Sequence, residues 1–390
     1  MRRRAAGTCL AAAIALALLL PAAALAQEED DGAIGEEIER QIGELDLGEW
    51  DAYAAGIGGL TGRELLTIDE LIADFAERGY SDTPGGLWDS LTLIAKAELK
   101  RSAGAVAALA AAALLTALTG LVADDGIRPL LGTILCGAAV TMTASVFASL
   151  CGAASDAVAS AGRLAESSIP IMSALLISLG SVSAAGMFRP LMLFLSGTVI
   201  FLVRNCVLPA ALFGGVLCIV DALTDGSKTG EMIKLVQKLT KWALGLVSTF
   251  YFGLSAVQGL TVASRDGVTV RTAKYALSGL VPIVGNMLGG TVDSVMGCAL
   301  LVKNGVGAAA ILILLSLLIR PLAVLTAGIF VFRVSAALSQ PAADPRVTRL
   351  FSGAADMTAQ LFACVAVTGA MTALTFLVFI ASGGISAGLW

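Results

Sequence analysis

The chain has 390 residues, of which 57% are hydrophobic and 14% are charged, and its mean hydropathy is +0.86. Soluble domains carry about 25% charged residues, so this composition excludes an ordinary soluble domain and indicates an integral membrane protein. The chain contains no histidine, which removes the commonest general base and a usual zinc ligand. Its net charge of −5 gives no basic footprint for nucleic acid. The composition therefore predicts a membrane protein, with no catalytic, cofactor or metal site recognisable in its sequence and no nucleic-acid partner.

Residues 1–26 have the layout of a secretory signal peptide. Three arginines precede an apolar run at 10–20, and small residues close the segment at 24–26. The apolar run is shorter than the roughly 20 residues that a membrane span needs. We therefore expect a mature chain that begins outside the cytoplasm, with an uncleaved membrane anchor as the alternative.

Residues 27–101 form an acidic region that differs from the rest of the chain. They contain 19 Asp and Glu against 6 Lys and Arg, whereas from residue 102 onward the counts are 11 against 16. Apolar residues recur in this region at helical spacing, as at Ile34, Ile38 and Ile42. We predict amphipathic helices in an extracytoplasmic region, whose apolar faces cover one another, a partner protein or the membrane surface.

Residues 102–382 are predicted to form an all-α, polytopic membrane domain, followed by a short tail at 383–390. A span needs roughly 20 apolar residues, and we expect about seven spans, within a range of about five to nine. Some apolar segments are clear, and others are interrupted by polar or glycine residues, so that each of these is either one strained span or a short hairpin. The clear segments are 103–123, 130–155, 169–187, 242–263 and 361–381, and the interrupted ones are 191–223, 275–302 and 305–332.

The segment 225–241 is basic and amphipathic. Lysines accompany an apolar side, which is the pattern of a helix lying on the cytoplasmic face against anionic lipid headgroups. The lysines are Lys228, Lys234, Lys238 and Lys241. A second basic segment, 264–274, follows after one predicted span, and the bias of Lys and Arg toward the cytoplasm cannot place both on the same side. Either 242–263 folds back or one of the two basic segments lies outside.

Polar and helix-breaking residues interrupt the apolar segments. A charged side chain at the centre of a span costs about 2.5–3.5 kcal/mol on insertion scales, so such residues usually face protein or water. Closely spaced glycines let helices approach one another, and a proline allows a broken helix. We interpret these residues either as structural pairs and snorkelling side chains or as a polar pathway or assembly surface. The candidates are Arg204, Asn205, Pro282, Gly285, Asn286, Gly289, Gly290, Asp293, Lys303 and Asn304.

Four stretches occur in an order that resembles the stage III sporulation protein AE family. They are GSVSAAGMFRPLMLF at 180–194, RNCVLP at 204–209, DGVTVRTAKYALSGLVPIVG at 266–285 and DSVMGCALLVKNGVG at 293–307. The resemblance implies a non-enzymatic membrane component of a sporulation-specific channel or secretion-like complex between mother cell and forespore, required for forespore development. It also implies a multi-pass location in the mother-cell membrane that surrounds the forespore.

The same resemblance implies partners. These are the other stage III sporulation A proteins, including a cytoplasmic ATPase, and indirectly the forespore stage II sporulation protein Q; membrane lipids are expected as well, and a homo-oligomer is left open. A stand-alone secondary transporter for a small solute or ion is the alternative, because broken helices and intramembrane charges occur in such proteins. A membrane scaffold without conduction is a third reading of the sequence.

Overall fold

Every element that the computed structural model describes is helical. The described residues are 31–45, 128–179, 182–224, 229–280, 284–340 and 345–382, with isolated positions between 47 and 111. Within the helices, side chains are described except at 31–35, 128–132, 182–184, 187–188, 256–280 and 284–296. The elements are α2 (Asp31–Gly43), α6 (Arg128–Ser178), α7 (Val182–Leu202), the π-helix η1 (Val203–Val207), α8 (Leu208–Leu223), α9 (Gly230–Leu280), α10 (Val284–Ser339) and α11 (Pro345–Ala381). The predicted all-α class is confirmed.

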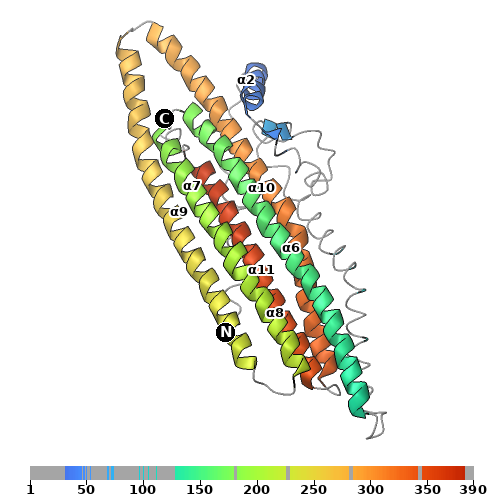
Figure 1. Cartoon of the computed structure of the whole chain (residues 1–390). Coiled ribbons are helices and arrows are strands. Elements are labelled where there is room, and N and C mark those ends of the chain that lie inside the picture. Colours follow the sequence, from blue (N-terminus) through green and yellow to red (C-terminus); the bar gives the residue numbers. More distant parts are fainter. Residues whose placement is uncertain are drawn as a thin grey trace.

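The long helices form an antiparallel bundle (Figure 1). α7, η1 and α8 together make one rod that returns beside α6, and α9, α10 and α11 follow in alternating directions. α11 contacts every other long helix, and its aromatic side chains Phe351, Phe376 and Phe379 are fully buried. α11 is therefore the centre of the bundle, and α9 lies at its edge (Figure 1).

α6 joins the predicted span 130–155 to the first part of the predicted span 169–187 without a loop between them. The second span is itself divided, because α6 ends at Ser178 and α7 begins at Val182. The charged residues that separate these spans are Asp156, Arg163 and Glu166, and all three are exposed. Their spacing places them on one face of a helix, while the opposite face of the same turns is buried. Polar residues at helical spacing continue a helix rather than end it, so the two predicted segments are not separated by a loop here.

Two of the interrupted segments are continuous as well. Segment 305–332 is one helix that passes through Pro321, and segment 191–223 is one rod that contains the π-helix. A proline is tolerated inside a membrane helix when neighbouring helices and local π-type turns satisfy the freed backbone groups. Neither segment is the hairpin that the sequence left open.

The basic segments belong to one long helix. α9 runs without a break through 242–263, so this segment does not fold back. In contrast, segment 275–302 is divided, because α9 ends at Leu280 and α10 begins at Val284. The division falls around Pro282, which agrees with the broken-helix interpretation of this segment.

Four helices among the described residues are long and apolar enough to cross a membrane. They are Thr133–Ser178, Arg189–Leu223, Gly297–Ser339 and Pro345–Ala381. The shortest has 35 residues and is about 50 Å long, whereas the hydrocarbon core of a bilayer is about 30 Å thick. The predicted segment 103–123 lies outside the described residues, so the count of about seven spans stays a prediction.

The apolar residues of the acidic N-terminal region are buried against the bundle. Ile38 and Ile42 of α2 are buried, and α2 packs against α10 (Figure 1). Trp50, Ile68 and Ile72 are also buried and belong to the same apolar cluster as the bundle core. The described residues therefore cover the bundle itself, a surface that was not among the three expected from the sequence.

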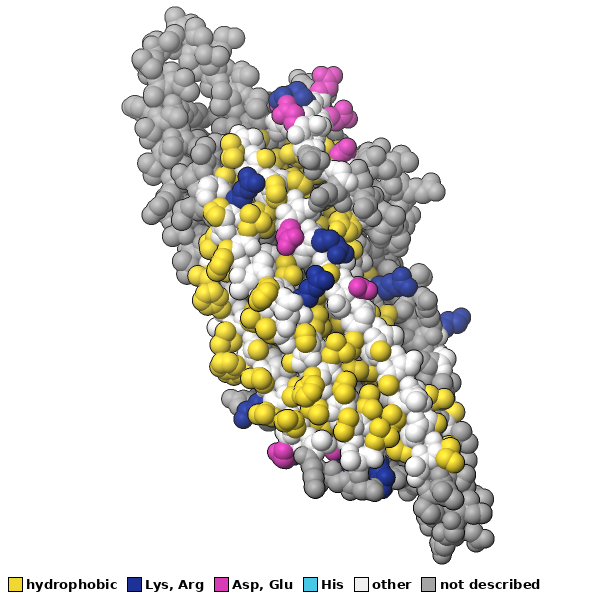
Figure 2. All heavy atoms as spheres, viewed as in Figure 1, with side chains coloured by type: hydrophobic (Ala, Val, Ile, Leu, Met, Phe, Trp, Pro, Cys, Tyr) yellow, Lys and Arg dark blue, Asp and Glu magenta, His cyan; other side chains and the backbone are white. Residues whose placement is uncertain are grey.

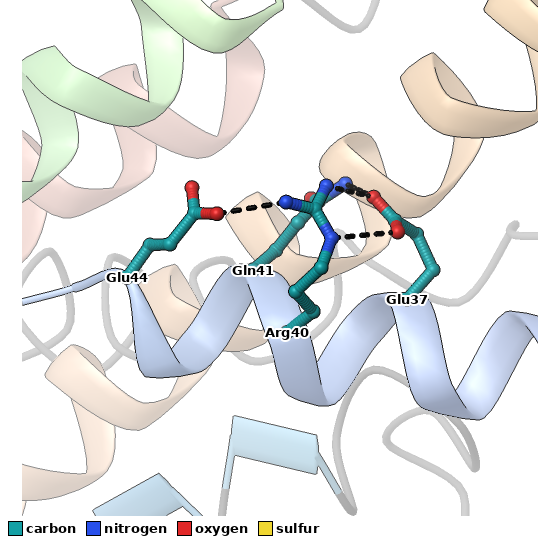
Figure 3. Close-up of polar contacts among 4 residues, drawn as sticks. All are labelled: Glu37, Arg40, Gln41 and Glu44. Carbon is teal, nitrogen blue, oxygen red and sulfur yellow. Dashed lines mark hydrogen bonds and ion pairs between the residues drawn. The ribbon is translucent and has the colours of Figure 1, made fainter.

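The polar side of α2 carries a network of charged side chains (Figure 3). Arg40 donates to Glu37 Oε1 at 2.6 Å and to Glu44 Oε1 at 2.8 Å. Gln41 Nε2 donates to Glu37 Oε1 at 2.8 Å. The hydrogen bonds from Arg40, followed by that from Gln41, lower the pKa of Glu37 to about 2. Glu37 is therefore ionised over the whole physiological pH range.

Candidate functional site

Lys303 lies in the bundle interior where α10 passes the last turn of α11. Its side chain is fully buried, and its Nζ donates to the carbonyl oxygen of Ile380 at 2.8 Å and to that of Ser382. Nζ also lies 5.8 Å from the centre of the Phe379 ring, within the range of a cation–π contact. The last carbonyls of a helix lack partners within it and carry the negative end of its dipole. Lys303 therefore caps the C-terminus of α11.

A close approach of the two helices makes this cap possible. Gly307 lies one turn after Lys303, and a Cβ atom there would collide with the side chain of Ile380. The glycine lets the α10 backbone come near enough for the ammonium to reach the α11 carbonyls. Asn304 is half-buried beside this contact. The contacts of Lys303 favour a structural role over a polar pathway at this position.

Arg204 has the opposite environment. It lies in η1 with Asn205 and Cys206, and all three are exposed, whereas Val203 and Val207 at the ends of the π-helix are buried. π-helical turns inside α-helices are rare and occur frequently at functional sites. The Arg204 side chain makes no ion pair with any residue in the described part of the chain.

Large apolar side chains are exposed on the same rod as Arg204. The side chains of Phe201 and Phe213 on the same rod are 63% and 51% exposed. Figure 2 shows apolar side chains spread over the face formed by α6, α7 and α8, with a group of charged side chains of both signs across its middle. A guanidinium among lipid-facing side chains is costly, so Arg204 is a candidate for contact with a protein partner.

Two close contacts fix how α6 aligns with the α7–η1–α8 rod. A Cβ atom on Gly162 would lie 2.9 Å from Cδ1 of Ile200, and one on Gly215 would collide with the ring of Phe147. Gly215 therefore leaves no room for a Cβ atom beside the Phe147 ring, and at Gly162 a Cβ atom would force the end of the Ile200 side chain to shift. The contacts also fix the antiparallel register of the two rods.

In this register Arg204 and Asp156 lie at nearly the same level of the bundle. They are within about one helical turn of each other along its axis. Asp156 is exposed on α6 and, like Arg204, forms no ion pair among the described residues. Two opposite charges therefore face outward from neighbouring rods at one height.

The predicted surface helix 225–241 is the beginning of α9. It starts at Gly230 and continues into the bundle, so it is not a separate helix. Lys234, Lys238 and Lys241 are exposed, and Lys234 Nζ lies 2.7 Å from Glu231 Oε1. Lys228 lies outside the described residues. The exposed apolar side of these turns consists of Met232, Leu235, Leu239 and Trp242.

The predicted polar and glycine-rich stretch at the start of α10 is described only by its backbone. Pro282 lies outside the described residues, and the side chains of the remaining candidates are not among those described. Those candidates are Gly285, Asn286, Gly289, Gly290 and Asp293. Their role as a packing or polar face stays a prediction.

Other polar groups contact each other although no sequence pattern predicts their pairing. Asp221, at the end of α8, accepts a hydrogen bond from Thr229 Oγ1 at 2.5 Å and lies 3.5 Å from Arg349 Nε. Arg333 of α10 and Asp356 of α11 form an ion pair at 2.6 Å. These partners come from different helices and share no motif, so only the packing of the helices reveals them.

The fold and these sites define a helical membrane protein with four candidate spans among its described residues. The chain matches the family described as Stage III sporulation protein AE over residues 66–383 and belongs to that family. It is 31% identical over 218 residues to Stage III sporulation protein AE of Bacillus subtilis (strain 168), an alignment that covers 56% of this chain. The chain spans about half the length, 55%, of that curated relative. No solved structure matches the chain.

Family membership has two consequences for this protein. It supports a role in sporulation, as the four ordered stretches of sequence had implied. The family is a sporulation component and is not a known enzyme family.

Proposed function

We propose that this protein is a non-enzymatic, multi-pass component of a channel or secretion-like complex between mother cell and forespore, required for forespore development. The observation that carries the proposal is the exposed Arg204 and Asn205 at the π-helix, on a rod that also exposes large apolar side chains. An arginine facing lipid at the centre of a span costs about 2.5–3.5 kcal/mol, whereas a partner with acceptor oxygens removes that cost. An assembly component needs such a surface, and an isolated transporter does not.

The remaining parts of this proposal follow from the family. The protein would reside in the mother-cell membrane around the forespore, with about seven spans and its acidic region outside the cytoplasm. Its partners would be the other stage III sporulation A proteins, including a cytoplasmic ATPase, and indirectly the forespore stage II sporulation protein Q. The exposed lysines at the start of α9 would face anionic lipid on the cytoplasmic side.

A second copy of the chain is the first partner that the described surface fits. Arg204 and Asp156 are opposite charges at one level on neighbouring rods, and neither has an ion-pair partner among the described residues. The exposed side of α6 before Asp156 is formed by small residues such as Ser149 and Gly152, whereas the facing rod exposes Phe201 and Phe213. Small residues let helices approach closely. A head-to-tail contact would therefore pair Arg204 of one copy with Asp156 of the next.

The test is a charge swap scored in sporulating cells of the native host. Arg204→Asp should lower the number of heat-resistant spores by about tenfold or more, because two carboxylates would then face each other and like charges repel. Adding Asp156→Arg should restore the number, and the amount of protein in the membrane should stay constant throughout. Arg163→Leu is the matched control, because it removes an exposed arginine of α6 at a different level.

Two results would contradict the proposal. Normal spore numbers for Arg204→Asp, with normal protein levels, would remove the assembly role of this face. Uptake of a solute by the purified protein in liposomes, without any partner, would indicate the stand-alone transporter instead.

A further inference from the structure

A polar pocket lies on the bundle where α9 meets α10 and α11. Its volume is about 290 Å³, and it is open on one side. The polar side chains that line it are Thr240 and Lys241 of α9, Arg333 of α10, and Asp356 and Gln360 of α11. None of these residues belongs to the sites described above for α11 capping or for the outward face of η1.

The pocket carries more positive than negative charge. Arg333 Nη2 lies 2.6 Å from Asp356 Oδ1, and their side chains are 46% and 37% exposed. This pair uses part of the guanidinium, which has five N–H donors. Lys241 makes no ion pair among the described residues. Two cations therefore face one carboxylate, and a ligand with a negative charge would balance the pocket.

Gln360 adds an unsatisfied acceptor to the same wall. The residue is 3% exposed, and its Nε2 donates to the backbone oxygen of Gln237 at 3.2 Å. Its Oε1 is buried and has no hydrogen-bond partner within the described part of the chain. Buried acceptors without a donor are rare, because no hydrogen bond offsets the free-energy cost of removing them from water. The pocket therefore also offers a place for a donor group of a ligand.

We propose that this pocket binds a phosphate group whose ligand also carries a hydroxyl, as in a glycerophosphate. The phosphate would contact Lys241 and the free N–H groups of Arg333, since charge-assisted contacts of Lys and Arg with phosphate are strong. The hydroxyl would donate to Gln360 Oε1. A carboxylate or phosphate without a donor would leave that oxygen unsatisfied.

Two kinds of ligand carry both a phosphate and a hydroxyl: a lipid headgroup and a soluble phosphate ester. The surface next to the pocket favours the lipid, because Leu239 and Trp242, beside Lys241 on α9, are 60% and 66% exposed. Acyl chains would cover these side chains while the headgroup enters the pocket. This inference does not rest on the proposed role in sporulation, and its test uses the purified protein alone.

The experiment measures ligand binding to the full chain purified in detergent, by native mass spectrometry and by the shift in Tm. The probes are phosphatidylglycerol, phosphatidylcholine, which lacks the hydroxyl donor, and soluble glycerol 1-phosphate. We expect phosphatidylglycerol to bind more tightly than phosphatidylcholine. Lys241→Gln should weaken its binding by about tenfold or more, the size expected for a charge-assisted contact.

Three further variants make the test specific. Lys234→Gln is the matched control, because it removes a lysine of the same helix that lies outside the pocket and pairs with Glu231; binding should not change. Gln360→Met should reduce the preference for phosphatidylglycerol over phosphatidylcholine, and the part that remains reflects the net negative charge of phosphatidylglycerol. Arg333→Lys keeps the charge but loses the planar fork, and it gives a second measurement if Lys241→Gln does not fold.

The outcomes separate the sources and the alternatives. If glycerol 1-phosphate binds with the same dependence on Lys241 and the lipid does not, the phosphate site stands and its ligand is soluble. If Lys241→Gln and Lys234→Gln weaken lipid binding equally, a general surface attraction explains the result and the proposal is overturned. Failure of all three probes to bind would also overturn it.

Discussion

Lys303 and Arg204 are both cations within helices that are long and apolar enough to cross a membrane, yet their surroundings differ completely. Lys303 is fully buried, and carbonyl oxygens of Ile380 and Ser382 accept its hydrogen bonds. Arg204 is exposed on a π-helix, and no described residue forms an ion pair with it. The chain thus satisfies one cation internally and presents the other outward.

The difference between a buried and an exposed cation predicts different effects on the stability of the chain and on its contacts with other molecules. A cation that the fold satisfies contributes to the free energy of unfolding of the chain, because its removal leaves buried acceptors without donors. A cation on an outward face contributes to contacts that form only with another molecule. Substitutions at the two kinds of position should therefore change different measurements.

The largest effect is expected for Lys303→Met. It leaves the last carbonyls of α11 without a donor, and each unsatisfied buried group costs about 1–3 kcal/mol. Thermal unfolding of the purified protein in detergent should show this loss as a lower Tm. Lys238→Met is the control, since Lys238 is exposed on α9 and surface changes usually stay within about 0.5 kcal/mol. An unchanged Tm for Lys303→Met would mean that the cap contributes nothing.

Tyr251→Phe tests a second internally satisfied group and should have a smaller effect. The Tyr251 hydroxyl donates to the backbone oxygen of Met371 at 3.0 Å and is also hydrogen-bonded to Thr375 Oγ1. Removing it should cost about 1 kcal/mol, the typical net value of a hydrogen bond. The same unfolding measurement applies, with Thr141→Val as the control on an exposed position of α6. Equal Tm values for both variants would show that the contact of α9 with α11 is not held by this hydroxyl.

Arg204→Leu should change the unfolding free energy by less than about 0.5 kcal/mol, as is usual for surface positions. The side chain is exposed and no described residue pairs with it, so nothing within the chain is lost. The measurement is again the Tm in detergent, where partners are absent. A decrease in Tm as large as that of Lys303→Met would contradict the contrast between the two cations, because Arg204 would then contribute to the internal structure of the chain.

The smallest effect concerns the Glu37–Arg40 pair of α2. The pKa of the Glu37 carboxyl is lowered from 4.5 to about 2. The ion pair therefore stabilises α2 fully above the pKa of the unfolded chain, and this stabilisation is lost as the pH falls from about 4.5 to 2. Hydrogen exchange of α2 amides, corrected for intrinsic rates, should therefore speed up between pH 5 and pH 2.5. Glu37→Gln should remove most of this pH dependence. The change should be slight because Glu37 and Arg40 form a surface pair.

The sequence predicted the helices better than their boundaries. The spacing of apolar residues in the N-terminal region predicted the helix of α2 and its buried side at Ile38 and Ile42, and both are confirmed. Asp156, Arg163 and Glu166 interrupt the apolar sequence between two predicted segments, although their spacing fits one exposed face of α6. Periodicity was the better guide there, because a charged side chain on an outer face does not oppose helix formation.

Composition and periodicity are local properties, and by themselves they predicted the membrane class, the all-α fold and the polar positions that needed an explanation. They allowed a broken helix at Pro282 but did not decide it. They could not say what those positions meet. The carbonyl that accepts from Lys303 lies 77 residues away along the chain, and the pocket takes its lining from three helices. Only the register of α10 against α11, and of α9 against both, brings these groups together. The tertiary structure alone therefore decided which polar residues form hydrogen bonds within the chain and which are exposed.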